Sequence, residues 1–153
     1  MSEPTWDRSR CPVAGTLGVI GEKWSLLVLR EAFLGVRRFA DLQRNLGAPK
    51  AVLTERLSTL VEAGILSRVP YQAQGERQRH EYRLTDKGRD LYPVLIALRQ
   101  WGNRHLDGGE GTSLATEHRD CGADVRLELT CAAGHRLEGA RDVQAVHRTA
   151  AAG

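Results

Sequence analysis

Four side chains near the C-terminus have the types and the spacing of zinc ligands. Two residues separate His118 from Cys121, nine separate Cys121 from Cys131, and three separate Cys131 from His135. Pairs of imidazole and thiolate ligands on either side of a strand-like segment are typical of small tetrahedral zinc sites. These residues are therefore a candidate zinc site, and the alternative is a metal-free hairpin with two inert thiols. No motif in the chain requires any other cofactor.

A third thiol lies near the N-terminus. Cys11 precedes Pro12, a residue favoured at the first position of a helix. The N–H groups at a helix start stabilise a thiolate, and Arg8 and Arg10 add positive charge nearby. Cys11 is therefore a candidate redox sensor, although a partly buried structural thiol fits the same position. Because no second cysteine is near it in the sequence, oxidation would link two subunits or form a mixed disulfide.

The middle of the chain has the pattern of two short helices joined by a tight turn. Apolar spacing predicts helices over 39–46 and 50–63, with Gly47 at the break. Two strands are predicted next, over 65–71 and 80–84, around a polar and basic tip. A helix-turn-helix followed by such a hairpin is typical of a winged helix, a fold that places its second helix in the major groove of DNA.

Three groups of residues in this arrangement are candidates for contact with double-stranded DNA. Cations at a helix start hold phosphates, small and polar side chains on the second helix reach base edges, and arginines on a wing contact the backbone or the minor groove. The candidates are Arg37, Arg38, Lys50, Ala51, Thr54, Glu55, Ser58, Arg77, Gln78 and Arg79. Any one of these arginines alone also fits a solvated surface charge.

The distribution of charge favours a polyanionic partner. The 153 residues include 22 Lys or Arg and 19 Asp or Glu, a net charge of +3. Residues 1–105 carry 17 basic and 11 acidic side chains, or +6, whereas residues 106–153 carry 5 and 8, or −3. Nineteen of the 22 basic residues are Arg, whose planar guanidinium binds phosphate oxygens two at a time.

Composition excludes several classes of protein. The longest uncharged run, residues 11–21, has 11 residues, against about 20 for a helix that spans a bilayer. Residues 1–10 lack the apolar core of an export signal, and an odd count of three cysteines does not suit a disulfide framework. We expect a cytoplasmic protein without a membrane partner. The chain has no glycine-rich phosphate loop, G-x-S-x-G or H-E-x-x-H motif, so an enzyme is not expected.

The last helix of the N-terminal part is expected to be long. Thr85 is predicted to cap a helix that ends near Leu106, with a kink or a break at Pro93. Its apolar face is wider than one packing contact requires, so one side is expected to cover the core and the other to meet a second copy of the chain. The alternative is a helix buried within its own chain.

The chain is expected to divide into a winged helix domain with a small appendage. The winged helix domain and its dimerisation helices occupy 1–106, and the composition of 107–113 is that of a flexible linker. Residues 114–147 predict a small hairpin or a degenerate zinc-ribbon-like appendage, with one half-buried strand over 125–129. Residues 148–153 predict a frayed tail.

Many residues over positions 8–106 stand in the order of a known family. They include Cys11-Pro12-Val13, Lys23-Trp24, Leu29-Arg30-Glu31, Arg37-Arg38-Phe39, Leu46-Gly47-Ala48-Pro49, Glu62-Ala63-Gly64-Ile65-Leu66 and Tyr82-Arg83-Leu84-Thr85. The pattern strongly resembles the HxlR-type winged helix-turn-helix transcriptional regulators, a branch near the MarR regulators. The resemblance implies an α+β, mainly α fold and a homodimer that binds an operator near a promoter. It also implies that the first and last helices build the dimer. Some members sense oxidants or electrophiles through a cysteine at the place of Cys11.

These observations together predict a homodimeric, sequence-specific DNA-binding regulator. Its expected action is repression, released by a small-molecule effector or a thiol-reactive signal. The alternative is a winged helix module for protein interaction or zinc binding that does not read DNA.

Overall fold

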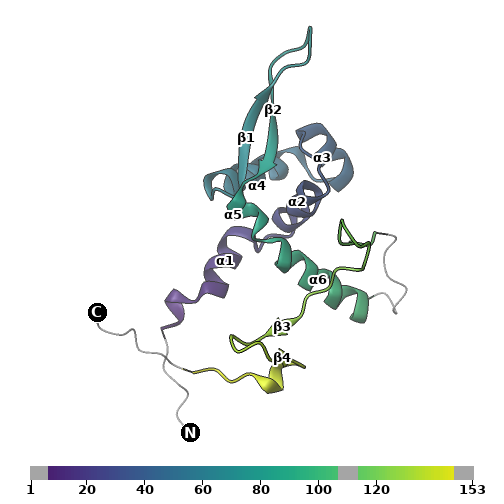
Figure 1. Ribbon diagram of the computed structural model, residues 1–153. Coiled ribbons are helices and arrows are strands. Elements are labelled where there is room, and N and C mark those ends of the chain that lie inside the picture. The colour runs from purple at the N-terminus through teal and green to yellow at the C-terminus, as the bar shows by residue number, and fades with distance from the viewer. Residues whose placement is uncertain (1–6, 107–113, 147–153) are drawn as a thin grey trace. The chain divides into compact units, whose positions relative to one another are not determined.

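The computed structural model describes residues 7–106 and 114–146 (Figure 1). It consists of two compact units, of which one comprises Arg10–Leu95 and the other includes the chain from Ile96 onward. The predicted linker over 107–113 and the predicted tail over 148–153 lie outside the described residues. Within the described residues, no helix is long and apolar enough to cross a bilayer.

The first unit begins with four helices, of which the last two agree with the helices predicted over 39–46 and 50–63 to within one residue. A short 3-10 turn, Arg8–Arg10, precedes the first of them. The helices are α1 (Pro12–Ile20), α2 (Lys23–Phe33), α3 (Phe39–Leu46) and α4 (Lys50–Glu62). Pro12 stands at the start of α1, where its missing N–H leaves no hydrogen bond unmade.

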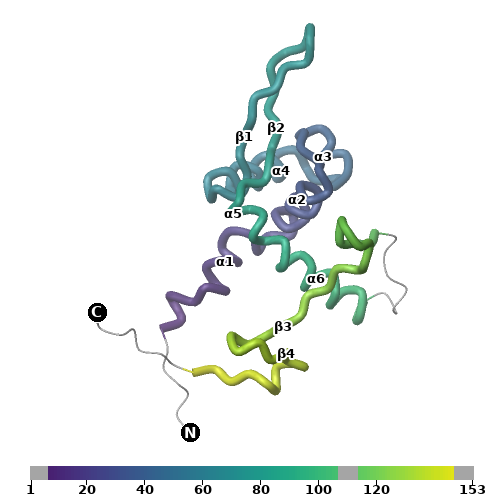
Figure 2. The backbone as a smooth tube through the Cα atoms, in the orientation of Figure 1, coloured from purple at the N-terminus to yellow at the C-terminus, as the bar shows by residue number. Residues whose placement is uncertain are grey.

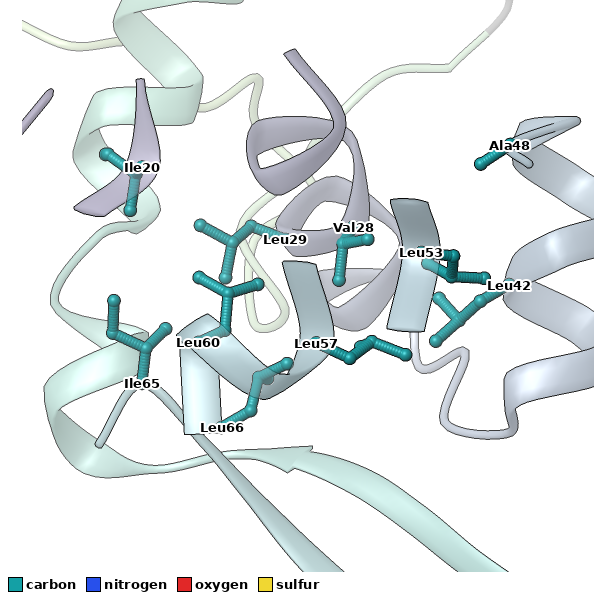
Figure 3. Close-up of a cluster of buried hydrophobic side chains, with 10 residues drawn as sticks. All are labelled: Ile20, Val28, Leu29, Leu42, Ala48, Leu53, Leu57, Leu60, Ile65 and Leu66. Atoms are coloured by element: carbon teal, nitrogen blue, oxygen red, sulfur yellow. The ribbon is translucent and has the colours of Figure 1, made fainter. Parts of the chain in front are cut away.

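The core of this unit lies where α2 and α4 pack together, as Figure 3 shows. Val28 and Leu29 of α2 and Leu53 and Leu60 of α4 are completely buried. Helix α2 is therefore the central helix of this unit. It also buries Glu31, whose carboxylate accepts hydrogen bonds from Asn45 of α3 and Arg30, both at 2.9 Å. These bonds satisfy the buried charge and connect α2 to α3.

A hairpin follows α4 and forms the wing. Strands β1 (Leu66–Tyr71) and β2 (Arg79–Leu84) pair antiparallel from Leu66↔Leu84 to Tyr71↔Arg79. Figure 2 shows the hairpin extending beyond α3 and α4. The N–H of Tyr82 donates to the carbonyl of Arg37 at 2.8 Å, so the segment before α3 joins the edge of β2. The predicted winged helix is confirmed.

The final helix breaks in two. Helix α5 (Asp86–Arg89) is capped by Thr85, whose Oγ1 accepts from the N–H of Gly88 at 3.0 Å. Helix α6 (Tyr92–His105) follows, with Pro93 in its first turn. A first-turn proline leaves no intrahelical hydrogen bond unmade, so the chain avoids the kink that Pro93 would impose on one continuous helix.

Gly88 of α5 packs against the chain so closely that a methyl group has no room. A Cβ at this position would overlap the carbonyl oxygen of Ile65 and come within 3.2 Å of the Leu84 side chain. We expect Gly88→Ala to lower the free energy of unfolding by about 2 kcal/mol through overpacking. Urea unfolding measures this loss. Gly102→Ala is the matched control, because its Cβ would meet only the Leu106 side chain at 3.8 Å. Equal stability of the two variants would contradict the packing at Gly88.

The appendage contains less regular structure than its sequence predicts. It has strands β3 (Leu129–Thr130) and β4 (Arg136–Leu137) and a 3-10 turn, Ala140–Asp142. The strand predicted over 125–129 is wrong for all but its last residue. The backbone of Leu127 instead bonds to Gln100 of α6: its N–H donates to Oε1, and Nε2 donates to its carbonyl at 3.3 Å. These groups are therefore unavailable to a strand partner.

Candidate nucleic-acid interface

Helix α4 presents one buried face and one exposed face. Leu53, Leu57 and Leu60 are at most 1% exposed. The five candidates for DNA contact on this helix are all exposed: Lys50, Ala51, Thr54, Glu55 and Ser58. The spacing of about 100° per residue explains both faces, because the three leucines recur at intervals of three and four residues.

Local bonds already occupy part of this outward face. The hydroxyl of Thr54 donates to the carbonyl of Lys50 at 2.8 Å, which leaves its methyl group and its lone pairs for a partner. The carboxylate of Glu55 accepts from Arg56 at 2.5 Å. A cytosine amine that donates to Glu55 would therefore compete with this arginine. Ser58 makes one long contact, 3.5 Å, to Glu62, and its hydroxyl can turn toward a base edge.

The two arginines before α3 differ in how firmly they are held. The guanidinium of Arg38 lies 4.4 Å from the centre of the Tyr71 ring, and its Nε lies 3.8 Å from the carboxylate of Glu81. Arg37 is exposed, and its side chain forms no ion pair within the described part of the chain. Arg38 is thus pre-positioned beside the wing, whereas Arg37 extends into solvent and can bind a phosphate without breaking a contact.

The wing carries the remaining candidates in exposed positions. Arg77 and Gln78 lie in the tip, and Arg79 begins β2 opposite Tyr71. The tip is closed by the N–H of Glu76, which donates to the carbonyl of Ala73 at 3.0 Å. The turn thus holds two arginines at the end of the hairpin, where a wing meets the DNA backbone.

An open groove of about 450 Å³ lies between the start of α3 and the wing. Its lining includes two basic residues that the sequence analysis missed, Arg68 and His80, together with Arg38 and Arg79. Two acidic residues, Asp41 and Glu76, line it as well. The first turn of α3 forms another side of this groove. Cationic side chains beside the N–H groups of a helix start make a site for a phosphate group. Arg68 and His80 could not be recognised as neighbours from the sequence. They share one face of the hairpin because Arg68 pairs with Tyr82 and His80 pairs with Pro70, and this register is known only from the structure.

The candidate redox sensor and the candidate zinc ligands do not line this groove. Cys11 is half-buried directly before α1 and forms no disulfide. The four zinc-ligand candidates come together two by two, His118 with Cys121 and Cys131 with His135. Within 7–106 and 114–146, no three His, Cys, Asp or Glu side chains converge as a metal site.

The helix pair, the exposed face of α4 and the basic wing define a winged helix-turn-helix protein of the DNA-binding class. Residues 19–110 match the family model described as HxlR-like helix-turn-helix. This match spans more than half of the chain, which therefore belongs to the HxlR-like helix-turn-helix family. The resemblance found in the sequence is confirmed.

Relatives in this family are regulators of transcription. The chain is 49% identical over 119 residues to the HTH-type transcriptional regulator Rv3095 of Mycobacterium tuberculosis H37Rv, covering 78% of this chain and 74% of that one. The solved structure of the transcription factor PA1607 is 42% identical, with a TM-score of 0.80 over 92% of this chain and 97% of that one. The oxidized form of the redox regulator HypR is 34% identical, with a TM-score of 0.57 over 63% and 99%. This chain is likewise a transcriptional regulator with a helix-turn-helix fold.

Proposed function

We propose that the protein is a homodimeric repressor that binds operator DNA and occludes a promoter. The observation that carries this proposal is the groove between α3 and the wing, which four basic side chains line, in the same compact unit as the exposed face of α4. One compact unit therefore carries the basic side chains of the groove, the N–H groups at the start of α3 and the small polar side chains of α4. In this role α4 lies in the major groove and reads base edges, while Arg37, Arg38 and the wing arginines hold the phosphate backbone.

Two helices support a dimer because each exposes apolar side chains. Val13 and Leu17 of α1 are 67% and 57% exposed, and Leu98 and Trp101 of α6 are 51% and 59% exposed. Contiguous apolar faces of this kind mark interaction surfaces. We assign both to a second copy of the chain, because two-fold symmetry of the protein then matches two half-sites about one helical turn apart on DNA. A regulator of this kind acts in the cytoplasm, the compartment also predicted from its thiols.

Sequencing the DNA that co-purifies with the protein tests this function. We expect recovered fragments to share a two-fold symmetric motif near promoters. Thr54→Ala/Ser58→Ala is the matched variant: it keeps the basic residues and removes two hydroxyls from the outward face of α4. It should retain DNA but lose the motif, because phosphate contacts bind without reading sequence. Random genomic DNA with both proteins would overturn the proposal and favour the module that does not read DNA.

We further propose that the releasing signal acts on the thiol of Cys11. Two features support this: no described cysteine is bonded to the thiol, and it directly precedes α1, one of the two proposed dimer helices. The similarity to the redox regulator HypR favours the same kind of signal. A small-molecule effector bound between the dimer helices and the core is the other candidate.

Cys11→Ser distinguishes these two signals. If oxidation of Cys11 releases DNA, the serine variant should bind DNA normally and remain bound under an oxidant or electrophile that frees the unmodified protein. The measurement is the fraction of labelled operator bound during peroxide or quinone titration. Ser9→Ala, which keeps all three thiols, is the control and should respond like the unmodified protein. Normal release from Cys11→Ser would contradict the thiol signal and favour the small-molecule effector.

A further inference from the structure

The zinc-ligand candidates of the appendage form two pairs with similar geometry. Nδ1 of His118 lies 3.2 Å from Sγ of Cys121, and Sγ of Cys131 lies 3.4 Å from Nδ1 of His135. Two neighbouring ligands on a tetrahedral zinc ion, with bonds of about 2.3 Å to sulfur and 2.0–2.1 Å to nitrogen, stand about 3.6 Å apart. Each pair therefore already has nearly the separation that a shared metal ion requires.

Each turn is closed by two backbone hydrogen bonds. The N–H of His118 donates to the carbonyl of Ala123, and the N–H of Gly122 donates back to His118, both at 2.8 Å. In the second turn, Cys131 donates to the carbonyl of its paired histidine at 2.9 Å, and Gly134 donates back at 2.8 Å. Both glycines have positive φ, +70° and +86°, which favours glycine. Each ligand pair thus lies in a turn closed by its own backbone hydrogen bonds, with the ligands three residues apart in the first turn and four in the second.

A carboxylate lies beside the first pair. Oδ2 of Asp120 is 3.9 Å from Nε2 of His118, the ring nitrogen that does not face the thiol. Histidines that bind a metal commonly donate this second N–H to a carboxylate, which fixes the ring and its tautomer. The side chain of His118 is 60% exposed, and Cys121 and His135 are exposed as well. The pairs are therefore accessible to another chain.

One chain does not complete either pair. No third His, Cys, Asp or Glu joins them within the described residues. The pairs lie at the two ends of the segment 124–130, and the backbone of Leu127 in that segment is bonded on both sides to Gln100 of α6. Each pair supplies two ligands of the four that a structural zinc ion takes.

We propose that a second copy of the chain completes the site: His118 and Cys121 of one protomer bind Zn²⁺ together with Cys131 and His135 of its partner. The two-fold symmetry of a dimer makes the arrangement reciprocal, so each dimer holds two equal zinc ions and uses all of its ligand pairs. Zinc binding displaces the protons of the two thiols to solvent, and no redox change occurs. The inference rests on the proposed dimer but not on DNA binding.

Metal analysis of dimers with two different tags tests the partner's contribution. One chain carries His118→Ala/Cys121→Ser and the other carries Cys131→Ser/His135→Ala. All proteins are loaded with Zn²⁺ and desalted before zinc and protein are measured. The unmodified protein should hold one zinc per chain, and each doubly substituted homodimer should hold none. The mixed dimer should hold one zinc per dimer, because it keeps one complete site between its chains. Cys11→Ser should keep one zinc per chain.

Three results would overturn a zinc site shared between two chains. A mixed dimer without zinc, beside an unmodified protein with one zinc per chain, would place all four ligands in one chain and overturn the proposal. One zinc per chain on a monomer would overturn it equally. An unmodified protein that retains no zinc would remove the metal site altogether and leave two metal-free turns. Circular dichroism of all the variants shows whether they fold, and DNA binding measured in parallel tests the repressor assignment separately.

Discussion

Replacing Arg77 and Arg79 with alanine is expected to weaken operator binding by about 100- to 1000-fold near physiological salt. Both side chains are exposed on the wing, and in a dimer the double substitution removes four cations from the DNA. Each lost phosphate contact lowers the slope of log K against log salt by about 0.9, so the slope should become shallower by about 3 to 4. A labelled-operator titration at several salt concentrations measures both quantities.

A charge-matched control separates the wing from the general charge of the protein. Arg119→Ala/Arg141→Ala removes the same charge from exposed positions in the appendage, in the other compact unit. We expect its operator affinity to change less than about twofold, because residues 106–153 carry a net charge of −3 and are not attracted to the phosphates. Equal losses for the two double variants would contradict a contact between the wing and DNA.

Leu57→Ala should lower the free energy of unfolding by about 3 kcal/mol. The Leu57 side chain is 1% exposed on the inner face of α4, and its removal leaves a cavity that the surrounding helices fill only in part. Urea unfolding followed by circular dichroism gives the value. The control is Leu34→Ala at the end of α2, where the side chain is 50% exposed and the expected loss is below about 1 kcal/mol.

A comparable loss at these two positions would contradict the assigned inner face of α4. The same pair tests the DNA interface indirectly. Because Leu57 does not face outward, its variant should bind the operator normally once the result is corrected for the folded fraction. A changed sequence preference in folded Leu57→Ala would show that α4 does not present the proposed face.

The helices and the wing could be predicted because their signals are local. Leu53, Leu57 and Leu60 recur at helical spacing, and the glycines at the ends of α3 and α4 mark where each helix stops. The exposed face of α4 could be predicted from the same three leucines, because it lies opposite them. The break before α6 was one of two outcomes that Pro93 allowed, and the structure has the one in which proline falls in a first turn.

The rest depended on contacts between residues far apart in the chain. Arg68 and His80 join the groove because β1 and β2 pair in a particular register, which no local pattern states. The contact of the Arg38 guanidinium with the Tyr71 ring also joins residues that are far apart in the chain. The alternation over 125–129 predicted a strand, but Gln100 satisfies the Leu127 backbone from 27 residues away. Tertiary hydrogen bonds of this kind override an alternating pattern.

The central claim is that the outward face of α4, the arginines before α3 and the wing together bind a specific operator. The most direct test is a titration of the recovered operator, and of a scrambled duplex of the same length, across a series of salt concentrations. With about six to eight phosphate contacts per dimer, log K should fall with log salt at a slope of about −5 to −7. The operator should bind at least about 10³-fold more tightly than the scrambled duplex. A slope near zero, or equal affinity for both duplexes, would contradict the account.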